Sequence, residues 1–133
     1  MNAIFWNDCP DVLPYRYIGP YKVSHYLRQH GFSTQVIDFV TNFTEEELYK
    51  FTSKFITEET LVIGVSMTFI GELSRNKEIS PVIVNVLTRI KQEYPNIKFI
   101  AGGYNADVID SFRIFDATVS SYGEDIVLEL LTF

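Results

Sequence analysis

The chain has 133 residues and a formal net charge of −6, with 47% hydrophobic and 21% charged residues. This length fits one domain with one hydrophobic core, and the composition excludes intrinsic disorder. Nucleic-acid binding requires clustered lysine and arginine side chains that displace counterions. The 11 basic residues are scattered along the chain, so the sequence argues against a nucleic-acid partner.

The sequence carries no signal for secretion or for membrane insertion. The first residues, MNAIFWNDCP, lack the basic segment and the long apolar stretch of a signal peptide. No apolar run approaches the roughly 20 residues that a transmembrane helix needs. Cys9 is the only cysteine, which excludes an internal disulfide and a cysteine-based cluster within these residues. We therefore expect a cytoplasmic protein with no membrane partner and no iron–sulfur cluster of its own.

The first third of the chain predicts a strand, a helix and a second strand. The apolar run at residues 3–7 is typical of a buried strand. A long loop leads to Pro20, which suits the first turn of a helix, and Gly31 suits the end of that helix. Residues 34–39, TQVIDF, predict the second strand. The residues that follow the helical spacing i, i+3, i+4, i+7 are Val23, Tyr26, Leu27 and His30.

The middle of the chain predicts a second helix and a central strand. Thr44 and Glu47 form the pattern of a capping box at a helix start. Residues 61–67, LVIGVSM, are apolar at both alternating sets of positions. That pattern indicates a parallel strand covered by helices on both faces. The inward face of the second helix is predicted to carry Leu48, Phe51 and Phe55.

The last third predicts two more strands, each followed by a helix. Ser80 and Pro81 begin a helix that ends before Pro95. Its inward face is predicted to carry Ile83, Leu87, Ile90 and Tyr94. The remaining elements are a strand at 98–103, a short helix at 106–112, a weaker strand at 115–123 and a helix at 124–133.

Strands that alternate with helices predict an α/β fold with right-handed crossovers. We expect a flavodoxin-like (Rossmann-like) three-layer sandwich whose parallel sheet has five strands in the order 2-1-3-4-5. Residues 1–133 would form a single domain.

In such sheets a ligand binds beyond the carboxyl ends of the strands, at the switch point between the first and third strands. Small and polar residues follow the strands there, and they predict a slot for a large, mostly neutral ligand. The candidate residues at these strand ends are Ser66, Thr68, Gly102, Gly103, Tyr104 and Gly123.

The sequence lacks the motifs that several familiar ligands and reactions require. The G-x-G-x-x-G pattern of dinucleotide-binding proteins and the P-loop are absent. A receiver domain needs an acceptor aspartate at the end of the third strand, where this chain has residues 66–68, SMT. The loop after the first strand is rich in proline and tyrosine, unlike a flavin-phosphate loop. No acid–base pair or nucleophile stands at the strand ends, so we expect no catalysis by this chain alone.

Four segments together resemble a known family. They are residues 15–39, YRYIGPYKVSHYLRQHGFSTQVIDF; 62–68, VIGVSMT; 90–106, IKQEYPNIKFIAGGYNA; and 117–131, ATVSSYGEDIVLELL. In this order and at this spacing, the chain resembles the N-terminal cobalamin-binding domain of cobalamin-dependent radical S-adenosylmethionine (SAM) enzymes.

The resemblance implies that the slot holds the nucleotide tail of cobalamin. Ser66 and Thr68 would contact the tail, and Gly102 and Gly103 would make room for it, beside Tyr104. Gly123 and Glu124 match the Gly-Glu pair at the start of the last helix. The first loop, with Tyr17, Ile18 and Gly19, would lie against the corrin face.

The chain departs from the pattern in two places. Classical cobalamin domains carry Asp-x-His-x-x-Gly after the first strand, with the histidine on cobalt, and neither Asp8 nor Asp11 has a histidine two residues later. The resemblance then implies binding without a histidine ligand. The Cys-x-x-x-Cys-x-x-Cys segment of radical SAM enzymes is also missing. We expect a fragment, a stand-alone module, or a chain that works with a radical SAM domain or subunit.

Two other functions stay open. The missing histidine and cluster segment favour an interaction domain that kept the fold and lost its ligand. A small enzyme for another nucleotide-like ligand is the third possibility, although the strand ends offer no acid–base pair for it.

Overall fold

The structure is a computed structural model that describes residues 1–8, 18–67, 81–103, 114–119 and 123–132. One five-stranded parallel sheet has the strand order β2-β1-β3-β4-β5, which confirms the predicted flavodoxin-like α/β fold. The strands are β1 (Ala3–Trp6), β2 (Thr34–Ile37), β3 (Val62–Ser66), β4 (Lys98–Gly102) and β5 (Ala117–Val119).

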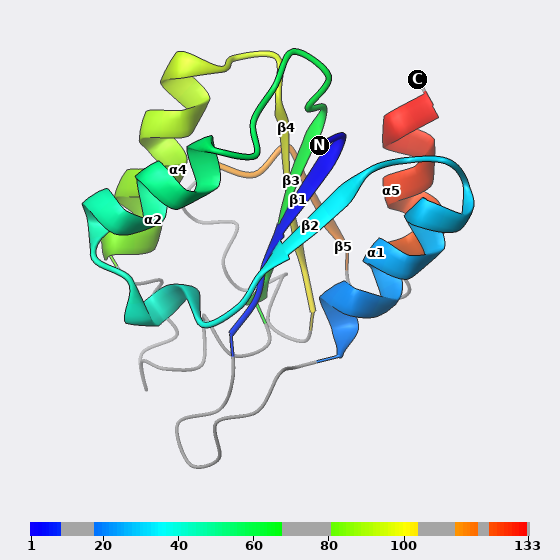
Figure 1. The fold of residues 1–133 in the computed structure, drawn as a ribbon, viewed down its shortest axis with the longest axis horizontal. Helices are drawn as coiled ribbons and strands as arrows, with labels where there is room; N and C mark the ends of the chain where they lie inside the picture. The colour runs from blue at the N-terminus through cyan, green and yellow to red at the C-terminus, as the bar shows by residue number, and fades with distance from the viewer. Residues whose placement is uncertain (9–17, 68–80, 104–113, 120–122, 133) are drawn as a thin grey trace.

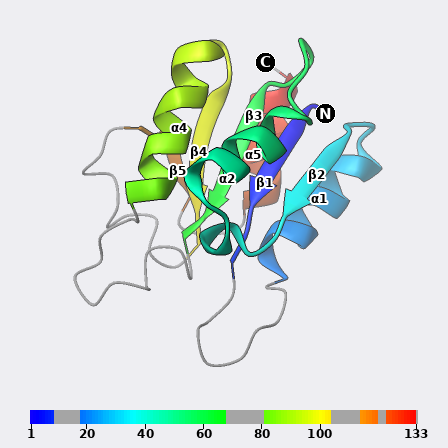
Figure 2. The same cartoon turned by 60° about the vertical axis from the view of Figure 1, so that its left-hand side comes forward.

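Helices cover both faces of the sheet. α1 and α5 lie on one face and α2 and α4 on the other, so the sheet is the middle of three layers (Figure 1). The order of the strands across the sheet can be followed in the turned view (Figure 2). The helices are α1 (Gly19–Gln29), α2 (Glu45–Ser53), α4 (Pro81–Glu93) and α5 (Gly123–Thr132), with a short 3-10 helix η1 (Val40–Asn42) after β2.

The central strands bury both of their faces, as their continuous apolar composition predicts. Along β1, Ile4 and Trp6 pack with the side chains of α2 and α4, whereas Ala3 and Phe5 pack with those of α1 and α5. The first four residues of β3 are buried as well. The sheet therefore separates two apolar cores.

The register between the strands aligns side chains into rows across the sheet. Phe5 lies opposite Gly64, and Gly64 lies opposite Ile100. Two residues further along the strands, Ser66 lies opposite Gly102, which in turn lies opposite Val119. Because side chains alternate along a strand, both rows face α1 and α5.

Two of the helix starts follow the sequence signals. Thr44 Oγ1 accepts a hydrogen bond of 3.2 Å from the backbone N–H of Glu47. Glu47 Oε1 accepts one of 3.1 Å from the backbone N–H of Thr44, so the predicted capping box is confirmed. Pro20 stands in the first turn of α1, also as predicted.

The predicted faces of α1 and α2 are confirmed in part: Leu27 and Leu48 are buried, and Val23 and Phe55 pack against the cores. In α1 the buried residues are Pro20, Ser24 and Leu27, whereas His30 is exposed. In α2 the buried residues are Leu48 and Thr52, whereas Phe51 is 37% exposed. Both helices bury a hydroxyl side chain that a hydrophobic pattern does not reveal.

The predicted face of α4 is confirmed. On α4, Ile83, Leu87 and Ile90 are buried, as predicted, and Tyr94 packs beside them after the helix has ended at Glu93. The short helix predicted at 106–112 lies outside the described residues. In the described part of the chain, every helix is too short or too polar to cross a lipid bilayer.

Candidate functional site

A cavity of about 290 Å³ opens on the face of the sheet that α1 and α5 cover. Its floor consists of the ends of β3 and β4, and its sides are the first turns of the two helices. This is the carboxyl end of the strands, where ligands bind in doubly wound folds. The cavity is thus where the strand order predicts a site.

Small residues create the cavity. Ser66 and Gly102 are register partners, and both line it. Among the residues that the structure describes, and leaving aside its two chain neighbours, the nearest atom to a Cβ built on Gly102 is the Val119 carbonyl oxygen, at 4.0 Å. The space above Gly102 is therefore open, and a larger side chain in this row would occupy the room that a ligand needs.

The first turns of α1 and α5 border the cavity. Ile18, Gly19 and Pro20 line it from α1, and Gly123 and Glu124 line it from α5. Ile18 precedes α1 and its side chain makes no capping hydrogen bond; it is 59% exposed. The first backbone N–H groups of a helix lack partners within the helix and carry a partial positive charge. This border can donate hydrogen bonds to a ligand oxygen.

Two charged residues line the cavity as well. Lys22 is exposed on α1, and Glu124 is half-buried on α5. The first turn of α1 contains no acidic residue, whereas that of α5 contains Glu124 and Asp125. The α1 side thus suits an anionic group, and the α5 side suits a neutral hydrogen-bond donor.

The predicted site residues come together. Tyr17, Thr68 and Tyr104 lie outside the described residues. All other predicted positions line the one cavity, although they come from four separate stretches of the chain. These positions are Ile18, Gly19, Ser66, Gly102, Gly103, Gly123 and Glu124.

The sequence reasoning missed several residues that line the inner part of the cavity. Phe5, Gly64 and Ile100 form one row of the sheet beneath it, and Val127 of α5 lines it too. Each of these residues reads as ordinary core in the sequence. The three strand residues could have been identified only from the alternation of side chains along β1, β3 and β4 combined with the register.

Met67 does not obstruct the cavity. It follows Ser66 directly, and a side chain of its size would fill the space if it faced α1 and α5. It is fully buried, however, in the core that α2 and α4 cover. The alternation of side chains at the end of β3 therefore keeps the cavity open at this position.

The histidines offer no ligand at the cavity. His25 and His30 are exposed on and just after α1, and neither is among the described residues that line the cavity. Within the described ranges, no group of three or more His, Cys, Asp or Glu side chains could hold a metal ion. Cys9 lies outside these ranges.

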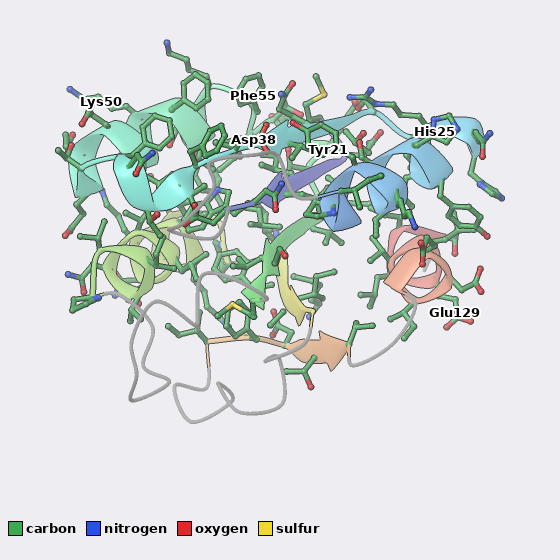
Figure 3. The ribbon with its side chains drawn as sticks, turned by 90° about the horizontal axis from the view of Figure 1, so that it is seen from below. Tyr21, His25, Asp38, Lys50, Phe55 and Glu129 are labelled. Atoms are coloured by element: carbon green, nitrogen blue, oxygen red, sulfur yellow. The ribbon has the colours of Figure 1, made fainter. Side chains whose placement is uncertain are left out.

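A polar cluster holds α1 against the end of the sheet. Asp38 follows β2, and its Oδ1 accepts a hydrogen bond of 3.0 Å from Asn7 Nδ2. Its Oδ2 accepts a hydrogen bond from the Tyr21 hydroxyl. Tyr21 and Asp38 lie near one another in the view onto the carboxyl ends of the strands (Figure 3). Because Tyr21 belongs to the first turn of α1, this cluster positions one side of the cavity.

Comparisons with known proteins yield structural relatives only. No protein family and no curated protein matches the sequence. The radical S-adenosylmethionine methyltransferase TsrM from Kitasatospora setae has a similar structure, with a TM-score of 0.71, 15% identity and 99% of this chain covered. A putative phosphosugar isomerase involved in capsule formation from Bacteroides fragilis has a TM-score of 0.54 and 11% identity over 90% of this chain.

These similarities show the fold. The chain spans 25% of the TsrM chain and 52% of the isomerase chain, so it corresponds to part of each. At 15% identity and below, a shared fold does not establish a shared ligand or reaction.

Proposed function

We propose that this chain is a cobalamin-binding module that takes the nucleotide tail of the cofactor into the cavity between the sheet, α1 and α5. The observation that carries the proposal is the convergence of seven predicted positions on that one cavity. The structural similarity to a radical SAM methyltransferase over 99% of the chain supports a role as a module of that class of enzyme.

The size and chemistry of the cavity suit a nucleotide tail. Its volume of about 290 Å³ lies just below the range for small-molecule sites, roughly 300 to 1,000 Å³. That volume accommodates a base and sugar, and the far larger corrin ring would remain outside, over the border that includes the exposed Ile18. At the start of α1 the Gly19 N–H suits the phosphate of the tail, whereas Pro20 has no N–H and the Lys22 N–H donates to the Ile18 carbonyl.

Individual residues would have distinct roles in holding the tail. Ser66 supplies a hydroxyl that can donate or accept a hydrogen bond. Gly102 and Gly103 allow the ligand to approach the backbone of β4 closely. Gly103 has a φ angle of +100°, which favours glycine in any case. Gly102 has no such conformational requirement, so its small size serves the cavity.

Cobalt would be bound without a histidine from this chain. No histidine is among the described residues that line the cavity, and His25 is exposed on α1. When bound, cobalamin supplies a cobalt centre that can carry an alkyl group. The residues of this module bind and orient the cofactor, and we propose that a radical SAM catalytic domain or subunit performs the reaction.

The direct test is retention of the cofactor. The purified chain at micromolar concentration is mixed with hydroxocobalamin and passed through a desalting column. We expect the protein fraction to carry the corrin absorption, with a spectrum shifted from that of the free cofactor. A colourless protein fraction would contradict the proposal and favour an interaction domain that has lost its ligand. A stable oligomer in light scattering would then support that alternative.

A further inference from the structure

The inner end of the cavity is closed by the ring of Phe5. Phe5 on β1 lies opposite Gly64 on β3 in the register of the sheet. A Cβ atom built on Gly64 would lie 2.6 Å from Cδ1 and 2.8 Å from Cε1 of the Phe5 ring. These separations are too short for any real side chain, so the ring occupies the space above Gly64. Glycine at position 64 is what allows the ring to lie across β3.

The neighbouring residues make this end of the cavity apolar. Ile100 is the register partner of Gly64 on the other side, and its Cγ1 would lie 3.4 Å from the same built Cβ atom. Behind Phe5, in the direction of the amino ends of the strands, Ala3 and Val62 are fully buried. Phe5 itself is 5% exposed and lines the cavity.

The polar groups stand nearer the opening. Ser66 and Gly102 lie one row closer to the carboxyl ends of the strands than Gly64 and Ile100 do. The helix starts and Lys22 border the cavity on that side. A ligand would meet hydrogen-bonding groups first, and its leading end would then meet the Phe5 ring. An aromatic wall favours a planar aromatic group because two rings gain from offset or edge-to-face contact beyond the burial of their surface.

We propose that Phe5, lying on Gly64, is a specificity-determining residue. It limits the depth of the cavity and selects ligands whose inserted end is a planar aromatic base. This inference rests on the proposed function, since cobalamin carries such a base at the end of its tail. Phe5 is not among the site residues predicted from the sequence, and those residues do not by themselves select an aromatic base.

The test compares two corrinoids, cobalamin and cobinamide, which lacks the nucleotide tail. Dissociation constants are measured for the unmodified chain, Phe5→Leu and a matched control, Val36→Ala. Val36 is the register partner of Phe5 on β2; it is buried in the same core but is not among the residues that line the cavity. We expect Phe5→Leu to weaken cobalamin binding by about threefold to tenfold, the range for loss of one aromatic contact. Cobinamide binding should stay unchanged, and Val36→Ala should alter neither affinity.

The possible outcomes separate the inference from the proposed function. If the unmodified chain binds neither corrinoid, the proposed function fails and the inference fails with it. If the chain binds cobalamin but Phe5→Leu changes both affinities equally, or changes neither, the role of Phe5 is wrong and the function stands. Should Phe5→Leu fail to fold, Phe5→Met removes the ring and replaces it with a flexible side chain that adapts to irregular gaps. The unmodified chain also provides a test without any variant, since equal affinity for the two corrinoids would overturn the inference.

Discussion

The hydroxyl of Tyr21 donates a hydrogen bond to the carboxylate of Asp38, and this contact ties the first turn of α1 to the end of β2. Asn7 donates to the other carboxylate oxygen from the end of β1. Three elements thus meet at one side chain. The start of α1 also borders the cavity, so this polar cluster links the stability of the fold to the shape of the site.

The first prediction concerns this cluster. Tyr21→Phe removes the donor to Asp38, and we expect a loss of about 1.5 to 3 kcal/mol in the free energy of unfolding, as for hydrogen bonds to charged groups. Urea denaturation would measure it, and cobalamin affinity should fall as well. Tyr26→Phe is the matched control, because the Tyr26 hydroxyl donates to Asp125 at 2.8 Å in an exposed position. An equal loss in both variants would contradict the importance of the Tyr21 contact.

The second prediction concerns the open space above Gly102. A leucine side chain there would project into the cavity between β4 and the two helices. We expect Gly102→Leu to fold and to lose cobalamin binding by at least about tenfold, because the ligand and the new side chain compete for one volume. Lys98→Leu is the control, since it places the same side chain at the exposed start of the same strand. Unchanged affinity in Gly102→Leu would show that the tail binds elsewhere.

The third prediction compares two glycines under one substitution. Gly64→Ala forces a methyl group against the Phe5 ring, and overpacking of this kind costs about 1 to 3 kcal/mol. In Gly102→Ala the nearest neighbour of the new methyl group in the described part of the chain is the Val119 carbonyl oxygen at 4.0 Å, so stability should change by less than about 0.5 kcal/mol. Thermal or urea unfolding of the two variants checks the difference. Similar losses for both would mean that the Phe5 ring moves aside at little cost.

The fourth prediction concerns a hydrogen bond inside the other core. The indole N–H of Trp6 donates to Thr52 Oγ1 at 3.2 Å, and both residues are fully buried. Thr52→Val preserves the shape but leaves the indole N–H without its acceptor, which should cost about 1 to 3 kcal/mol. Thr52→Ser keeps the acceptor and should cost less, although it deletes a methyl group. The opposite ranking in urea unfolding would show that packing dominates at this position.

The fifth prediction concerns acid stability. Hydrogen bonds from the backbone of Thr44, and then from its side chain, hold the pKa of Glu47 below its ordinary value of 4.5. A carboxyl group whose pKa is lower in the folded state stabilises the fold above its unfolded pKa. This stabilisation is lost as the pH falls through the folded pKa. As the pH is lowered from about 6 to about 3, the free energy of unfolding should therefore fall less steeply for Glu47→Gln than for the unmodified chain.

Thr44→Ala provides the second arm of this experiment, because it breaks the same capping box from the other side. It should flatten the acid dependence only in part, because it removes the side-chain hydrogen bond that lowers the pKa of Glu47 but keeps the larger contribution from the Thr44 backbone. A parallel pH profile for all three proteins would show that the lowered pKa of Glu47 contributes nothing measurable.

Two helix faces show where pattern reasoning fails and why. Ser24 is buried because its hydroxyl pairs with that of Thr34 on β2, and Thr52 is buried because it accepts from Trp6. Hydrophobic periodicity assigns such residues to the surface, although a paired hydroxyl is stable in a core. The partner of each lies on a different element, so no local pattern announces it. The prediction therefore placed Leu27 and Leu48 correctly but missed the two buried hydroxyl residues, Ser24 and Thr52.

The sequence by itself determined the architecture. Apolar runs on both alternating faces marked the central strands, and alternation with helices predicted a parallel sheet in the observed order. Small residues after β3 and β4 predicted which end of the sheet would carry a cavity, because the backbone direction alone places all parallel strand ends together.

Only the tertiary structure decided how deep that cavity is and what closes it. Phe5 and Gly64 are 59 positions apart in the numbering, and their meeting depends on the register between β1 and β3. Register arises from side-chain packing across the whole sheet, which no single segment encodes. The aromatic inner wall, and the selectivity proposed for it, follow from that long-range alignment.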